Sequence, residues 1–128
     1  MNLIISNKSD KPIYEQIYEQ IVSQIISGEL PPNFCLPSIR NIASELRISI
    51  ITIKKAWELL ESNGFIYTKV GKGCFVSEYS KIHLEKKKEY IAIEKLRNDL
   101  KYYKQLGLSL DDLLELIKKE YGGIWKGC

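Results

Sequence analysis

The strongest constraint on the fold is a change in the hydrophobic period near residue 65. Before this point apolar residues recur at helical spacing, most clearly as an isoleucine at every fourth position over residues 13–25. After it, two β-branched and aromatic runs at 65–68 and 74–77 flank a basic, Gly-rich turn, which is the pattern of a β-hairpin. The sequence therefore predicts a mostly α fold with a small β-hairpin.

The first three predicted helices have recognisable ends. Pro12 opens the first helix and Gly28 ends it, since proline is tolerated at the first helical position and glycine just after the last. The second helix starts with the Leu-Pro-Ser run at 36–38, and Ser49 is placed to cap a third helix that ends at 63–64. These helices and the hairpin make a head, residues 1–77, that can form its own core. The aromatic residues expected in that core are Tyr14, Tyr18, Trp57 and Phe75.

Residues 78–128 form a tail with a different pattern. A long helix over 78–106 carries an apolar seam, and a short helix over 110–121 starts at a capping box on Ser109 and ends at the glycines 122–123. A lone amphipathic helix is marginal in water, so the seam needs a partner. We expect the short helix to fold back on the long one and a two-fold mate to cover the rest, although the tail could instead pack on its own head. The residues expected at the dimer contact are Ile93, Leu96, Leu100, Tyr103, Leu113 and Ile117.

Composition excludes several classes of protein. The 128 residues contain no run of about 18 apolar residues and no basic segment before a long apolar one, so we expect a cytoplasmic protein without a membrane span. The net charge of +3 is only weak evidence for a nucleic-acid partner. Cys35, Cys74 and Cys128 are odd in number and widely spaced, which favours reduced thiols over a disulfide framework or a zinc site.

The sequence does not predict an enzyme. Catalysis requires clustered titratable groups or a cofactor loop, whereas the single histidine, His83, lies in a charged part of the tail. The glycines at 71 and 73 are too few for a nucleotide-binding loop, and they lie in a hairpin rather than at the start of a helix. We therefore expect no catalytic residues, no metal ligands and no cofactor.

Three short helices followed by a hairpin form the winged helix-turn-helix arrangement, in which the third helix can lie in the major groove of DNA. The tip of the hairpin can then reach the DNA backbone or the neighbouring minor groove. Five segments in register make the chain resemble the GntR family of regulators, and more narrowly its YtrA-type branch. They are Pro-Ile-Tyr-Glu-Gln-Ile at 12–17, Ser-Gly-Glu-Leu-Pro-Pro at 27–32, Leu-Pro-Ser-Ile-Arg at 36–40, Thr-Ile-Lys-Lys-Ala-Trp at 52–57 and Gly-Lys-Gly-Cys-Phe-Val at 71–76.

The resemblance implies a set of residues that face DNA. Arg40 would contact DNA, because a guanidinium can fork onto a phosphate or onto the O6/N7 edge of guanine; the alternative is a surface salt bridge to Glu45. In the third helix Thr52 would donate to a phosphate, and Lys54 would bind phosphate or guanine unless it is an ordinary solvated lysine. The residues expected at the DNA are Ser38, Arg40, Ser49, Ile50, Ile51, Thr52, Lys54, Lys69, Gly71, Lys72 and Gly73.

Ile50 and Ile51 depart from the polar residues that are common at these two positions of the family. If both are exposed, they form an apolar patch that a monomeric surface normally avoids. Our hypothesis is that they contact the C5-methyl groups of thymine, which predicts an A/T-rich operator beneath the start of the third helix. The alternative is that one of them packs against the preceding turn.

The function implied by the resemblance is that of a sequence-specific regulator of transcription. It would bind a two-fold site on double-stranded DNA as a homodimer, with repression as the family's default. The alternative is a winged helix that binds a protein, with Ile50 and Ile51 as its apolar contact. The two-helix tail is too small to enclose an ordinary ligand pocket of ~300 Å³. A small-molecule effector, if there is one, would have to bind between subunits or between tail and head.

Overall fold

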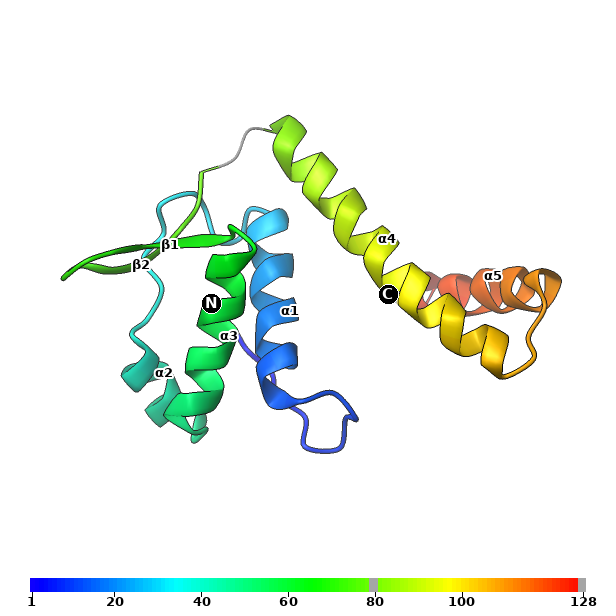
Figure 1. The fold of residues 1–128 in the computed structure, drawn as a ribbon, viewed down its shortest axis with the longest axis horizontal. Coiled ribbons are helices and arrows are strands. Elements are labelled where there is room, and N and C mark those ends of the chain that lie inside the picture. The colour runs from blue at the N-terminus through cyan, green and yellow to red at the C-terminus, as the bar shows by residue number, and fades with distance from the viewer. Residues whose placement is uncertain (79–80, 127–128) are drawn as a thin grey trace. The chain divides into compact units, whose positions relative to one another are not determined.

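The computed structural model describes residues 1–78 and 81–126, and these form helices and two strands in the predicted order (Figure 1). The chain divides into an N-terminal unit, Met1–Leu84, and a C-terminal unit, Glu85–Cys128. The prediction of a mostly α fold with a small hairpin is confirmed. The elements are α1 (Ile13–Ile26), α2 (Ile39–Leu46), α3 (Ile50–Ser62), β1 (Ile66–Lys69), β2 (Gly73–Val76), α4 (Lys81–Gln105) and α5 (Leu110–Lys126).

The core of the N-terminal unit lies between α1 and α3, which run side by side (Figure 1). The apolar stripes of both helices meet there, and Ile17, Ile53 and Leu60 have no exposed surface. Trp57 is buried as predicted. Tyr14, Tyr18 and Phe75 were expected in the core but are only half-buried. The Tyr18 ring packs edge-on against buried Phe65, whereas Phe75 stacks on Tyr67 outside the core.

Two serine caps fix where α2 and α3 begin. The Ser38 Oγ accepts a hydrogen bond from the Asn41 backbone N–H at 3.1 Å, and the Ser49 Oγ accepts from the Thr52 N–H at 3.2 Å. Each bond satisfies one of the N–H groups that a helix start leaves without a partner. The cap predicted at Ser49 is confirmed, and the turn between α2 and α3 is thereby held to a few residues.

The hairpin is a two-stranded sheet with one further backbone pairing, which was not predicted. Strands β1 and β2 pair antiparallel with Ile66 opposite Val76, each displaced by one residue from the range expected. Residues 33–36 pair with the other edge of β2: the Asn33 N–H donates to the Val76 carbonyl at 2.8 Å, and the Leu36 N–H donates to the Cys74 carbonyl at 2.9 Å. The hairpin is thus held to the segment that leads into α2.

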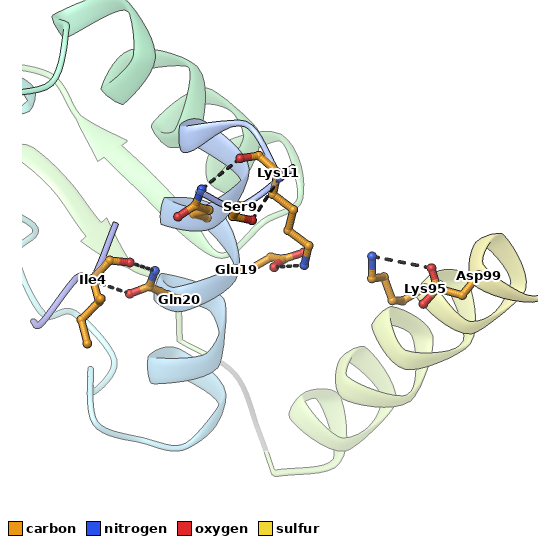
Figure 2. A network of polar contacts seen from close by, with 8 residues as sticks. Ile4, Ser9, Lys11, Glu19, Gln20, Lys95 and Asp99 are labelled. Carbon is orange, nitrogen blue, oxygen red and sulfur yellow. Dashed lines mark hydrogen bonds and ion pairs between the residues drawn. The ribbon is translucent and has the colours of Figure 1, made fainter. Parts of the chain in front are cut away.

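The first residues of the chain lie along α1, held by glutamine side chains. Gln20 exchanges two hydrogen bonds with the backbone of Ile4, at 2.8 and 2.6 Å (Figure 2). Gln16 does the same with the backbone of Ser6, at 2.9 Å for each bond. One turn of helix separates the two glutamines, so they reach alternate residues of an extended segment. Residues 2–6 are therefore an ordered arm of the N-terminal unit.

The C-terminal unit is a pair of helices. The turn between α4 and α5 passes through Gly107, and Ser109 and Asp112 exchange two hydrogen bonds in the predicted capping box. In α4 the Lys95 ammonium lies 3.8 Å from Asp99, one helical turn on (Figure 2). The end of α5 predicted at the glycines 122–123 is wrong, because the helix continues through them to Lys126. No helix in the described part of the chain is long and apolar enough to cross a membrane.

Candidate nucleic-acid interface

The N-terminus of α3 presents the residues predicted to face the major groove. Ser49 and Ile50 are exposed, and Ile51 keeps 80% of its surface in solvent. Thr52 is half-buried, and its Oγ1 lies 2.8 Å from the Ser49 Oγ. Ile50 keeps 49% of its surface in solvent. An exposed pair of β-branched apolar side chains at the tip of a short helix is costly in water, and this suits a surface that is covered by a partner.

The two basic residues predicted on the helices are both exposed. Arg40 lies in the first turn of α2 and forms no ion pair with any residue that the structure describes, so the alternative pairing with Glu45 is absent. Lys54 lies 4.0 Å from Glu58, at the limit for an ion pair, and both side chains are well solvated. A surface pair of this kind contributes little to stability, so the ammonium can exchange its partner.

The tip of the hairpin is shaped by glycine. Gly71 and Gly73 have φ values of +76° and +117°, which residues with a Cβ rarely adopt. The Lys72 N–H donates to the Lys69 carbonyl at 2.9 Å and closes the turn, which leaves the Lys72 side chain exposed. The Lys69 ammonium lies 5.6 Å from the centre of the Phe75 ring. The tip therefore carries two cations and a backbone that can approach a phosphate closely.

Two features near the start of α3 were not predicted. Arg47, between α2 and α3, is exposed and has the left-handed φ of +57°. A polar groove of about 440 Å³ lies beside it, and Asn7, from the segment that follows the arm, is one of the residues that line it. The four-residue spacing of Gln16 and Gln20 is the one sequence signal for the arm, and nothing in the pattern indicated a left-handed arginine.

The residues predicted for dimer contact lie in the C-terminal unit, and all of them except Ile93 line an apolar groove of about 380 Å³. Leu113 is buried under α4, while Leu100 and Tyr103 are half-buried. Ile93, Leu96 and Ile117 are exposed. The described helices therefore leave part of their apolar surface uncovered. The groove is lined by Leu96, Leu100, Tyr103, Leu113, Leu116 and Ile117, among others.

Within residues 1–78 and 81–126, no group of three or more His, Cys, Asp or Glu side chains could hold a metal ion. The Cys35 and Cys74 thiols are free, and Cys128 lies outside the described residues. His83 is exposed.

Comparison with known proteins identifies the relatives of this fold. Residues 13–76, which run from α1 to β2, match the model of the bacterial regulatory proteins of the gntR family. The HTH-type transcriptional regulator YhcF of Bacillus subtilis is 35% identical over 87% of this chain and 91% of its own. The HTH-type transcriptional repressor YtrA of the same organism is 34% identical over 90% of this chain and 88% of its own.

Two solved structures share this fold. A Listeria monocytogenes protein described as a transcriptional antiterminator is 30% identical, with a TM-score of 0.73 over 94% of this chain and 90% of that one. AraR(DBD) in complex with operator ORX1 is 29% identical, with a TM-score of 0.53 over 60% of this chain and 99% of that one. The likeness thus extends through both units in the first case and covers a smaller share of this chain in the second.

Proposed function

The chain belongs to the GntR family, YtrA type, and is a DNA-binding transcription regulator; from this premise we propose that it represses transcription from a two-fold operator as a homodimer. Its relatives include a protein named as a repressor, and AraR(DBD) was solved on an operator. The fold itself does not carry the proposal, because winged helices also bind proteins. The observation that carries it is the basic and polar surface at the start of α3 and at the hairpin tip.

The proposed DNA contacts are of two kinds: contacts to backbone phosphates, which position the protein, and contacts to base edges, which recognise the sequence. Ser49 is exposed and Thr52 half-buried at the start of α3, where backbone phosphates would flank a helix that enters the major groove. Arg40, without an ion pair in the described structure, is available to fork onto phosphate or guanine. Lys54 is exposed on the next turn of α3 and its contact with Glu58 is long enough to give way. Ser38 caps the N-terminus of α2, and we expect this helix end to face the same stretch of DNA.

The hairpin would contact the DNA backbone beside the groove that α3 occupies. Lys69 and Lys72 supply charge, and Gly71 and Gly73 let the main chain come close to sugar and phosphate. Such contacts carry no sequence information of their own. They set the register of α3 on the duplex.

Ile50 and Ile51 would read thymine through its C5-methyl group. Both are exposed at the tip of α3, and neither can donate or accept a hydrogen bond through its side chain. The operator should accordingly be A/T-rich under this end of the helix. Replacing both residues by Asn should weaken binding mainly at the A/T positions. An equal loss at every base would contradict this assignment.

Dimerisation would use the uncovered face of the C-terminal unit. Leu96 and Ile117 are about half exposed beside the apolar groove, and a second copy would remove them from water. Two DNA-binding units on one scaffold bind a two-fold site with the benefit of effective concentration. An effector, if the protein uses one, would be held between the two subunits. We place the protein in the cytoplasm, together with its DNA.

The experiment is selection of duplexes from a random-sequence library by the full-length protein, followed by titration of the selected site at several salt concentrations. We expect a two-fold, A/T-rich site whose affinity falls steeply with salt, by a logarithmic slope of about −0.9 for each phosphate contact. Arg40→Ala should abolish the selection. Arg97→Ala is the matched control, because Arg97 is an exposed arginine in the C-terminal unit, 3.9 Å from Glu94.

Failure of selection, together with a shallow salt slope on any duplex, would contradict the proposal. The exposed isoleucines would then point to a protein partner, since an apolar contact depends little on ionic strength.

A further inference from the structure

Arg47 has a backbone conformation that its residue type does not explain. Among the described residues that are not glycine, only Asn33 and Arg47 have positive φ, at 66° and 57°. Asparagine tolerates this region, and the Asn33 Oδ1 also accepts a hydrogen bond from the Tyr67 hydroxyl at 2.7 Å. Arginine adopts this region less readily than asparagine, and glycine is the usual residue where a helix ends in this way. A strained position filled by a long cation suggests that the side chain has a function.

The Arg47 side chain lines a polar groove at the start of α3. It is exposed and forms no ion pair with any residue in the described ranges. Ser49, Thr52 and Asn7 line the same groove of about 440 Å³, together with the apolar residues Ile5, Ile13, Leu46 and Ile48. The position of Asn7 is set by its neighbour, because Gln16 holds the backbone of Ser6 through two hydrogen bonds. The groove is therefore built by segments that are far apart in the sequence.

We propose that Arg47 and Asn7 bind a backbone phosphate of the DNA beside the N-terminus of α3. The inference rests on the proposed function, since α3 must enter the major groove. A helix about 10–12 Å wide fills a groove of about 12 Å, so phosphates flank it on both sides. Arg40 and Arg47 lie at opposite ends of α2 and so contact different phosphates. The guanidinium supplies a forked, permanent charge, and the Asn7 amide supplies a neutral donor.

The test separates phosphate binding from a structural role, because one substitution should lower the affinity for DNA without lowering the stability of the protein. Arg47→Gly removes the cation and relieves the left-handed backbone, so its melting temperature should be unchanged or higher by about 2–4 °C. Its affinity for DNA should nevertheless fall about tenfold, and the magnitude of the logarithmic salt slope should drop by about 1 per protomer. The same change is expected on the selected operator and on a mixed-sequence duplex, because a phosphate contact is independent of sequence.

Two variants serve as controls. Arg97→Ala removes the same charge from the C-terminal unit and should leave the salt slope as it is. Arg47→Lys keeps the charge without the fork, so it should keep most of the slope. Arg47→Gly with the affinity and slope of the wild type would overturn the inference, as would a loss of affinity accompanied by an equal loss of stability. If the wild type prefers no sequence but Arg47→Gly still lowers the slope on the mixed duplex, the operator proposal fails and this inference stands.

Discussion

The two units bury their apolar residues to different extents. In the N-terminal unit Ile17, Ile21, Ile53 and Leu60 have no exposed surface, and the core closes without help. In the described part of the C-terminal unit only Leu113 is buried, although the helices there are longer. Its large exposed apolar residues are Tyr90, Ile93, Leu96, Tyr102, Leu106, Leu110, Leu114, Leu116, Ile117 and Tyr121. The comparison teaches that one unit buries its own core, whereas the described helices of the other leave apolar surface in solvent, which is the surface that the proposed homodimer would cover.

The largest expected effect is a cavity in the N-terminal core. Leu60→Ala removes a fully buried side chain at the end of α3 and should lower the free energy of unfolding by roughly 2–5 kcal/mol. Leu110→Ala, at a residue 70% exposed in α5, should change it by less than about 0.5 kcal/mol. Urea denaturation of both variants measures the difference. Equal losses would mean that the two units do not differ as described.

A second effect concerns association. Leu96→Asp together with Ile117→Asp places charge on the apolar face of the C-terminal unit, so the protein should sediment as a monomer. Because two linked DNA-binding units gain from effective concentration, its operator affinity should fall at least about 100-fold. The matched control is Lys101→Asp, an exposed residue of α4. A dimer that survives the double substitution would show that the contact lies elsewhere.

A third, smaller effect distinguishes the helix caps of the two units. Ser49→Ala removes the cap of α3 and should lower the stability of the N-terminal unit by about 1 kcal/mol. Ser109→Ala removes the cap of α5, in the C-terminal unit, and should leave the stability of the N-terminal unit unchanged. Hydrogen exchange of the α3 amides follows the N-terminal unit directly. Faster exchange in α3 on Ser109→Ala would mean that the units are coupled.

The smallest effect is in the response to pH. Burial raises the pKa of Tyr18 above its usual value, with the Asn63 hydrogen bond opposing it, so stability from this group is full below the ordinary tyrosine pKa and is lost as pH rises. Hydrogen bonds from Ser109 lower the pKa of Asp112, so its contribution to α5 is lost as pH falls below the ordinary carboxyl pKa. Tyr18→Phe should reduce the loss of stability at alkaline pH, and Asp112→Asn should reduce the loss at acidic pH. Circular dichroism against pH tests both signs.

The elements followed from the sequence because side-chain patterns specify them. The isoleucine stripe of α1 and the serine caps of α2 and α3 are local signals. The pairing of residues 33–36 with β2 was missed because main-chain hydrogen bonds leave no side-chain pattern. The helix end expected at residues 122–123 was wrong because glycine permits a left-handed stop without requiring one.

The residues of the candidate interface could be predicted from the sequence only in part. Motifs pointed to Arg40, Lys54 and the hairpin glycines, and the structure shows all of them exposed or at turns. Arg47 was missed because the feature that distinguishes it is a left-handed backbone φ, which the amino-acid sequence does not reveal. The groove beside it depends on Asn7, brought there by the hydrogen bonds of Gln16 to the preceding residue. Such a site appears only when distant segments are placed in space.

The central claim is that two copies of the chain bind one two-fold operator. The most direct test is the stoichiometry and affinity of the full-length protein on the selected duplex and on a duplex with one half-site scrambled. We predict two chains on the intact site and an affinity for the scrambled site lower by about 100-fold or more. One chain per duplex, with equal affinity for both, would contradict the account.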